Sequence, residues 1–182
     1  MDDVAYIRSL IEAAAANYSI DTRRIGLIGH SNGGFMALRM ACEASDLVTS
    51  VVSLAGSTFA DDASCSPTTK PVSVLALHGD ADTRILYDGG QSGAVTYPGA
   101  KETIKRFAAH AGCDSSSPVR APNLDVVANI AGAETTVLYY SGCIESVEVA
   151  LWTINDAGHG PGPWETSGLD SVVDWVIEHP RQ

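Results

Sequence analysis

Short apolar runs alternate with helix-like segments along this chain, and this alternation restricts the possible folds more than any other feature. Three runs have the length of a buried strand: RIGLIG (24–29), VTSVVSLAG (48–56) and PVSVLALHG (71–79). Runs that are apolar throughout indicate strands covered on both faces. We therefore predict an α/β fold with a mostly parallel sheet between helices, and functional side chains at the carboxyl ends of the strands.

The remaining elements fit the same plan. Helical spacing of apolar residues predicts helices at 2–18, 35–42, 99–111 and 166–179. In the last helix, the predicted buried face consists of Leu169, Val172, Val173, Val176 and Ile177. Two further strands are predicted at 134–142 and 147–156, and two polar, proline-containing loops at 57–71 and 112–123.

Length and charge exclude several classes of protein. A chain of 182 residues is long enough for one domain and too short for two, so we expect a single domain over 1–182. The formal net charge of −11 opposes binding to the phosphates of nucleic acid. No apolar run approaches the ~20 residues of a membrane-spanning helix. We therefore expect neither a nucleic-acid nor a membrane partner.

Four cysteines, Cys42, Cys65, Cys113 and Cys143, lie far apart and form no Cys-x-x-Cys pair. This spacing argues against a zinc site or a dithiol redox motif, and no metal or other cofactor is expected. Two disulfides or four buried thiols are possible, with three ways of pairing. The start MDDVAYIRSL shows no secretion signal, so the protein is cytoplasmic or its start has been removed.

The stretch GHSNGG (29–34) contains the pattern G-x-S-x-G in Gly29, Ser31 and Gly33. In this pattern the glycines let the backbone pass close to a serine held at a strained turn between a strand and a helix. A buried-strand run precedes the stretch and a helical segment follows it, which is the context that the pattern requires. Ser31 is therefore the candidate nucleophile.

A serine hydroxyl needs a base to remove its proton and an acid to orient that base. Asp82 follows the strand that ends in LALHG, and His159 follows the strand that ends in WTIND. The chain order Ser31, Asp82, His159 is the order expected for a hydrolase sheet. We predict these three residues as nucleophile, acid and base.

Other histidines and acids are weaker candidates. We expect His30 to point into the structure away from the serine, His78 to pack or hydrogen-bond locally, and His110 and His179 to lie at helix ends. Two other aspartates compete with Asp82 for the role of the acid, namely Asp80 and Asp156. The acidic group formed by Asp80, Asp82 and Asp88 could instead bind calcium, but it lacks the downstream Glu of an EF-hand.

Together, GHSNGG, HGDADTRILYDGG (78–90) and the Gly-His turn after VEVALWTI resemble one branch of the α/β-hydrolase superfamily. This branch contains polyhydroxybutyrate-depolymerase-like and feruloyl-esterase-like enzymes, and the resemblance covers residues 2–179. In the branch, His-Gly-x-x-Asp followed by Tyr-x-Gly-Gly carries the catalytic acid. The resemblance thus implies Asp82, accompanied by Tyr87, Gly89 and Gly90.

The resemblance has further implications. It suggests a Cys113–Cys143 disulfide, with Cys42–Cys65 as the second bridge. Such bridges imply an oxidising compartment, extracellular or periplasmic, in tension with the missing signal. For the substrate, we expect contacts from His30, Tyr87 and Trp164.

The sequence also departs from the branch. Members commonly continue the histidine turn as His-x-Trp-Pro, whereas here Gly-Pro-Gly-Pro precedes Trp164, so the aromatic wall near the base is displaced. Only one helix precedes the nucleophile strand, so the first half of the fold is expected to be absent. The retained oxyanion donor would be the N–H of Asn32, and loss of the other donor typically reduces turnover by about 10²–10³.

Without preceding strands, RIGLIG would become an exposed apolar edge. We predict that this edge pairs with a second copy in a two-fold dimer, or that rearranged elements cover it. For function, we predict a serine carboxylic-ester hydrolase acting through an acyl-enzyme on short acyl esters, hydroxyalkanoate polyesters or feruloyl esters. The alternatives are a weak or inactive hydrolase fragment or binding module, and a peptidase on the same scaffold.

Overall fold

A computed structural model describes residues 2–65, 70–114 and 118–181 of the chain. Both predicted loops fall partly outside these ranges, at 66–69 and at 115–117, as do the two terminal residues of the predicted domain. Among the described residues, no helix is long and apolar enough to cross a membrane.

A six-stranded sheet forms the centre of the molecule, in the order β1-β2-β3-β8-β7-β6. Its strands are β1 (Gly26–His30), β2 (Ser50–Leu54), β3 (Ser73–Gly79), β8 (Val149–Ile154), β7 (Thr135–Tyr140) and β6 (Val119–Arg120). The first four in this order run parallel, and β7 and β6 are antiparallel to their neighbours. The predicted α/β fold with a mostly parallel sheet is confirmed.

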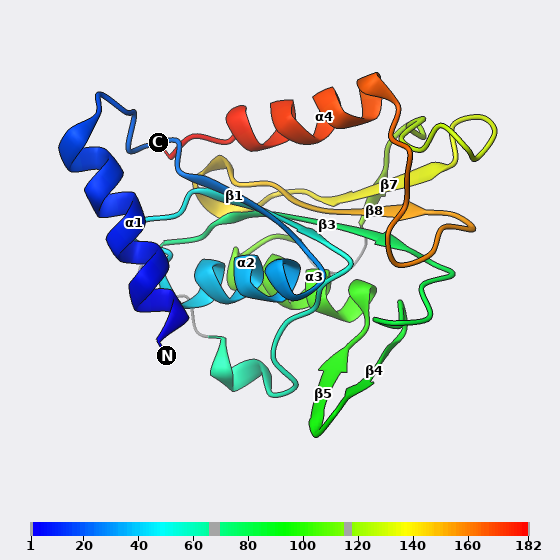
Figure 1. The fold of residues 1–182 in the computed structure, drawn as a ribbon, viewed down its shortest axis with the longest axis horizontal. Coiled ribbons are helices and arrows are strands. Elements are labelled where there is room, and N and C mark those ends of the chain that lie inside the picture. The colour runs from blue at the N-terminus through cyan, green and yellow to red at the C-terminus, as the bar shows by residue number, and fades with distance from the viewer. Residues whose placement is uncertain (1, 66–69, 115–117, 182) are drawn as a thin grey trace.

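Helices cover both faces of the sheet (Figure 1). The four α-helices are α1 (Asp3–Asn17), α2 (Asn32–Glu43), α3 (Ala100–His110) and α4 (Thr166–Ile177). In Figure 1, α2 and α3 lie below the sheet, α4 lies above it, and α1 packs on α2 at one end. Two short 3₁₀ helices, η1 (Asp62–Ser64) and η2 (Ile144–Ser146), complete the helical elements of the described residues.

Two hydrophobic clusters form the core, one on each face of the sheet. The cluster below the sheet includes Leu38 and Met40 of α2 and Ile104 of α3. The cluster above it includes Val172 and Trp175 of α4. Because β3 and β8 lie between the two clusters, every residue of both strands is buried, as predicted for the apolar run of β3.

The prediction for α4 was correct in position and wrong in part of its buried face. Val172 is buried as predicted, together with Gly168 and Trp175, whereas three other members of the predicted face are exposed, namely Leu169, Val173 and Ile177. Gly168 lies so close to the backbone of Val126 that a Cβ added at Gly168 would be 2.7 Å from the Cα of Val126. The Trp175 indole N–H donates to the Glu148 carboxylate at 3.0 Å. These two contacts fix the rotation of the helix.

A hairpin of β4 (Gly89–Ser92) and β5 (Val95–Pro98) projects from the face of the sheet that carries α2 and α3 (Figure 1). The sequence analysis did not predict it, because its first strand, GGQS, has neither apolar alternation nor β-branched residues. Its anchor is Tyr97, which is buried and accepts the Leu86 N–H on its hydroxyl at 3.1 Å.

Both disulfides that the resemblance suggests are present. Cys42 at the end of α2 is bonded to Cys65 after η1, and Cys113 is bonded to Cys143. The four cysteines therefore tie surface segments to the core.

The strand β1 lies at the edge of the sheet and, within the described part of the chain, pairs only with β2. The side chain of Ile28 on this strand is 56% exposed. Unpaired backbone groups and an exposed apolar side chain occur together at this edge, as the sequence predicts for RIGLIG.

Candidate active site

Ser31 lies at the sharp turn between β1 and α2. Its backbone has φ 56° and ψ −119°, a strained conformation for a residue with a side chain. The turn is tight enough that a Cβ on Gly29 would lie 2.1 Å from the carbonyl oxygen of Gly33. A Cβ on Gly33 itself would meet nothing within 4 Å. Of the two predicted glycines, only Gly29 is therefore required by lack of space.

Three side chains meet at the carboxyl ends of β1, β3 and β8. His159 places its Nε2 2.8 Å from the Oγ of Ser31 and its Nδ1 2.8 Å from the Oδ2 of Asp82. The Asp82 side chain is fully buried, and that of His159 is 13% exposed. The sequence separates these residues by up to 128 positions, and the parallel strands bring them into one hydrogen-bonded line.

The carboxylate of Asp82 is held by the backbone that follows it. Its Oδ1 accepts the N–H groups of Arg84 at 2.8 Å and of Ile85 at 3.0 Å. Burial alone would raise the pKa of Asp82, but the hydrogen bonds from His159 and from these two N–H groups outweigh burial and lower the pKa. Asp82 is therefore ionised near neutral pH and can stabilise a positive charge on His159.

A second histidine, His78, lies against the same carboxylate. Its Nε2 donates to the carbonyl oxygen of Ile85 at 2.8 Å and lies 3.3 Å from the Oδ2 of Asp82. Burial of the ring, which is 2% exposed, lowers the pKa of His78 despite the nearby acid. A neutral ring with its proton on Nε2 fits these contacts. The predicted local role of His78 therefore includes support of the Asp82 loop.

The other candidate acids connect loops. Asp80 accepts the backbone N–H of Asp156 at 2.7 Å, which joins the turn after β3 to the turn after β8. The N–H of Ala81 donates to the carbonyl of Ala157 at 3.0 Å across the same gap. These bonds position Asp82 and His159 relative to each other. Among the described residues, no group of three or more His, Cys, Asp or Glu could hold a metal ion.

Three residues with predicted substrate contacts have other partners. His30 is exposed, and its Nε2 lies 2.8 Å from the carbonyl oxygen of His159. The prediction that it points into the protein was wrong, because β1 is an edge strand. Tyr87 is buried beneath the Asp82 loop, with its hydroxyl 2.6 Å from the Thr153 hydroxyl. Trp164 packs on the upper core cluster. The substrate contacts expected of these three residues stay predictions.

The two remaining histidines belong to other clusters. His110 lies 3.4 Å from the carboxylate of Asp62, near the Cys42–Cys65 disulfide. His179 lies 3.7 Å from the carboxylate of Glu148, at the amino end of β8. Neither is part of the hydrogen-bonded line through His159.

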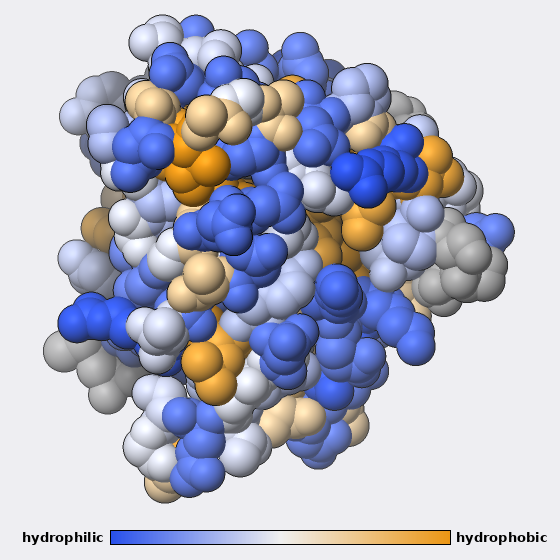
Figure 2. Space-filling view, turned by 90° about the vertical axis from the view of Figure 1, so that its right-hand side faces the viewer, coloured by the Kyte–Doolittle hydropathy of each residue, from blue (hydrophilic) through white to orange (hydrophobic). Residues whose placement is uncertain are grey.

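The helix α2 begins directly after Ser31, so its first N–H groups lie beside the serine. The N–H groups in the first turn of a helix have no acceptor within the helix and carry a partial positive charge. Asn32 is the first residue of α2 and offers such an N–H next to Ser31. Figure 2 shows the face at the carboxyl ends of the strands, where apolar patches are separated by hydrophilic side chains.

Residues 1–114 match the sequence profile of the phospholipase/carboxylesterase family. The chain belongs to this family. The match includes the turn at Ser31 and the Asp82 loop, and it fits the α/β-hydrolase fold described above.

Relatives of this phospholipase/carboxylesterase family member are named as esterases. The chain is 30% identical to NocK of Nocardia uniformis subsp. tsuyamanensis, a candidate esterase, over 96% of this chain and 57% of that protein. It is 23% identical to feruloyl esterase D of Neurospora crassa, over 88% of this chain and 48% of that protein. The chain therefore spans about half the length of the curated relatives that it matches.

Solved structures support the fold. An acetyl xylan esterase from Aspergillus awamori superposes with a TM-score of 0.66 over 95% of this chain and 66% of that chain, at 16% identity. The esterase PE8 superposes with a TM-score of 0.58 over 95% of this chain and 58% of that one, also at 16% identity. At these identities the similarity establishes the α/β-hydrolase architecture.

Proposed function

We propose that this chain is a serine carboxylic-ester hydrolase, with Ser31 as nucleophile, His159 as general base and acid, and Asp82 as the residue that orients His159. The observation that carries the proposal is the unbroken hydrogen-bonded line from Ser31 through His159 to Asp82, with 2.8 Å at each step. Nucleophile, base and orienting acid within hydrogen-bond distance are the geometry that serine acyl transfer needs.

In the first half of the reaction, the Oγ of Ser31 attacks the ester carbonyl carbon while its proton passes to the Nε2 of His159. The carbonyl oxygen becomes an oxyanion, and the N–H of Asn32 at the positive end of α2 donates to it. Asp82 accepts a hydrogen bond from the Nδ1–H group and, as a carboxylate, stabilises the imidazolium. The C–O bond to the alcohol then breaks, and the leaving oxygen takes the proton from Nε2.

In the second half, water replaces the alcohol. His159 removes a proton from the water while the water oxygen attacks the acyl carbon. A second oxyanion forms and accepts a hydrogen bond from the Asn32 N–H. Its collapse releases the carboxylic acid and returns the proton to Ser31. The same two bonds of His159 serve both halves, so a single geometry is sufficient for the cycle.

The test is turnover of p-nitrophenyl acetate by the wild-type chain and by Ser31→Ala. We expect the substitution to reduce kcat at least about 10³-fold, because the nucleophile is lost. Ser171→Ala is the matched control, because Ser171 lies on α4 and its hydroxyl donates to the Ser167 carbonyl at 2.7 Å, away from Ser31. Equal rates for wild type and Ser31→Ala would refute the proposal.

For substrates, we propose short acyl esters, hydroxyalkanoate polyesters or feruloyl esters, in line with the resemblance and with the name of the Neurospora relative. We also propose an extracellular or periplasmic location, which the two disulfides support because such bonds persist in oxidising compartments.

The predicted dimer through β1 also remains a proposal. The edge position of β1 and the exposed side chain of Ile28 support pairing with a second copy across a two-fold axis. Light scattering coupled to size-exclusion chromatography would measure the mass of the chain in solution. A monomer over the whole concentration range would contradict the dimer.

A further inference from the structure

A groove of about 670 Å³ opens beside the candidate active site, on the face of the sheet that α2 and α3 cover. It starts at Asn32 and Gly33, the two residues after Ser31, and continues along α2 as far as Arg39. Seven residues of helix correspond to about 10 Å. The groove therefore extends from the proposed oxyanion donor over the length of a medium-sized organic group.

The walls of this groove are mainly apolar and come from four segments. The large apolar side chains that line it are Tyr6 and Ile7 from α1, Phe35 and Met36 from α2, Phe59 from the segment after β2, and Val95 from the hairpin. The charged lining residues are Asp3 and Arg39, and the Arg39 guanidinium forms two hydrogen bonds to Glu43, at 2.7 and 3.2 Å. Such a lining favours an uncharged group over an ion.

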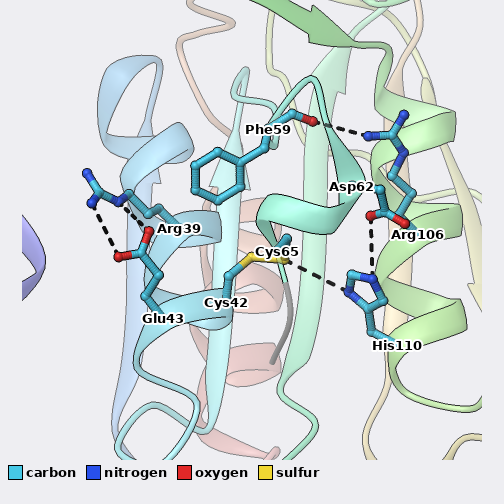
Figure 3. Close-up of a disulfide and its surroundings, with 8 residues drawn as sticks. All are labelled: Arg39, Cys42, Glu43, Phe59, Asp62, Cys65, Arg106 and His110. Atoms are coloured by element: carbon cyan, nitrogen blue, oxygen red, sulfur yellow. Dashed lines mark hydrogen bonds and ion pairs between the residues drawn. A yellow bond between two sulfur atoms is a disulfide. The ribbon is translucent and has the colours of Figure 1, made fainter. Parts of the chain in front are cut away.

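The wall that carries Phe59 is held in place at three points (Figure 3). Arg106 donates to the carbonyl oxygens of Phe59 at 3.1 Å and of Ala60 at 3.3 Å. His110 lies 3.4 Å from the carboxylate of Asp62, and Cys65 is bonded to Cys42 of α2. A wall fixed before binding loses little conformational entropy when a ligand enters.

The wall of this groove contains one buried polar atom without a partner among the described residues. Thr58 lines the groove, is 7% exposed, and its Oγ1 has no hydrogen-bond partner among the described residues. Buried hydroxyl groups are almost always hydrogen-bonded. The neighbouring Ser57, by contrast, bonds to the Pro98 carbonyl at 2.6 Å. Because this oxygen is itself closed off from solvent, Thr58 stays inside the wall, and the groove offers a bound group mainly apolar contacts.

We propose that this groove binds an uncharged, mainly apolar group of the ester substrate, with the cleaved bond at Ser31 and the chain extending along α2 towards Arg39. This inference rests on the proposed function, because it takes Ser31 as the nucleophile. The groove then sets the preferred substrate length: a two-carbon acyl group leaves it empty, whereas an eight-carbon group fills part of it and gains apolar burial.

The test compares kcat/KM for p-nitrophenyl octanoate with that for p-nitrophenyl acetate. Val95→Trp places a large ring in the groove from an exposed position that contributes nothing to the core. We expect the octanoate/acetate ratio to fall at least tenfold, or about 1.4 kcal/mol. Val119→Trp is the matched control, because Val119 is an exposed strand residue outside the groove, and its ratio should equal that of wild type. Phe59→Ala, which removes a wall, should also lower the ratio.

If neither Val95→Trp nor Phe59→Ala changes the octanoate/acetate ratio of kcat/KM, the proposal that the groove binds the substrate is wrong, even if Ser31 is the nucleophile. A binding measurement separates the two proposals. The Ser31→Ala variant lacks the proposed nucleophile, so binding of the ester can be measured in it without turnover. Adding Val95→Trp to this variant should weaken the binding of p-nitrophenyl octanoate at least tenfold. Equal Kd values would refute the groove, whereas equal turnover by wild type and Ser31→Ala would refute Ser31 as the nucleophile and with it the placement of the cleaved bond.

Discussion

Both ends of the central sheet hold a histidine beside a carboxylate, and the two pairs differ in what the second ring nitrogen contacts. At the carboxyl end, His159 bonds to Asp82 through Nδ1, and its Nε2 faces the hydroxyl of Ser31. At the amino end, His179 lies near Glu148 through Nε2, and its Nδ1 faces the backbone carbonyl of Trp175. A hydroxyl can give up a proton, whereas a carbonyl only accepts one.

The difference affects which nitrogens can carry protons. His179 has an acceptor at both nitrogens, which favours a proton on each. Burial lowers the pKa of His179, but the bonds to Glu148 and to the Trp175 carbonyl outweigh burial and raise it. His159 instead has one acceptor and one hydroxyl, so it can hold a free lone pair towards Ser31. The group that faces the second ring nitrogen, a hydroxyl at His159 and a carbonyl at His179, therefore separates the candidate base from the structural histidine.

Of the changes that test this comparison, removing the charge of Asp82 should have the largest effect on turnover. We expect Asp82→Asn to reduce kcat for p-nitrophenyl acetate by about 10³–10⁴, because an amide neither stabilises the imidazolium nor fixes its tautomer. Asp80→Asn is the matched control on the same turn, because Asp80 bonds to the backbone of Asp156 and not to His159. Equal losses in the two variants would show that the loop, rather than the Asp82 charge, supports activity.

Much of this candidate site could be predicted from the sequence. Ser31, Asp82 and His159 were identified because each follows a strand-like run, and parallel strands bring their carboxyl ends to one edge. The need for a glycine at position 29 was equally visible from the G-x-S-x-G pattern. What the sequence could not show was the environment of each side chain. Tyr87, for example, has the position of a substrate contact in the motif but lies buried against Thr153.

The fold was predicted less completely where packing between distant segments decides the outcome. The apolar pattern of α4 offered several faces, and contacts with Val126 and Glu148 selected the one with Gly168 and Trp175. The groove is built from four separate segments, so no local pattern indicates it. The unpartnered hydroxyl of Thr58 is likewise a property of the folded chain.

His78 offers a second test of the comparison between the histidines, because it contacts the carboxylate of Asp82 without facing a serine. We expect His78→Leu to reduce kcat by about 10–100-fold at nearly constant KM, since the Ile85 carbonyl loses its donor and the Asp82 loop shifts. His78→Gln retains an N–H donor and should restore much of the loss. Failure of Gln to restore more kcat than Leu would contradict a positioning role for the Nε2 donor.

At the opposite end, His179→Leu should affect stability and not turnover. The side chain of Glu148 is 40% exposed, so solvent screens the pair and we expect a loss of about 0.5–1 kcal/mol in the free energy of unfolding. Denaturant unfolding of wild type and variant measures this difference, with kcat for p-nitrophenyl acetate as the second readout. A tenfold fall in kcat would show that the two ends of the sheet are coupled and would break the comparison.

The smallest effect expected is the pH dependence of that stability difference. Because the folded pKa of His179 is raised, its contribution is fully present below the unfolded pKa of about 6.5 and is lost as pH rises through the folded pKa. The pKa of Glu148 is lowered, chiefly by its bond to His179, so Glu148 stays ionised down to about pH 4.5. Wild type and His179→Leu should thus differ most in free energy of unfolding between about pH 5 and 6.5 and converge above.

The lowered pKa of Asp82 keeps the contribution of Asp82 to stability constant over this range, because that contribution disappears only as pH falls below about 3.9. A stability difference that grows with rising pH would mean that His179 is held neutral, and the contrast with His159 would then disappear.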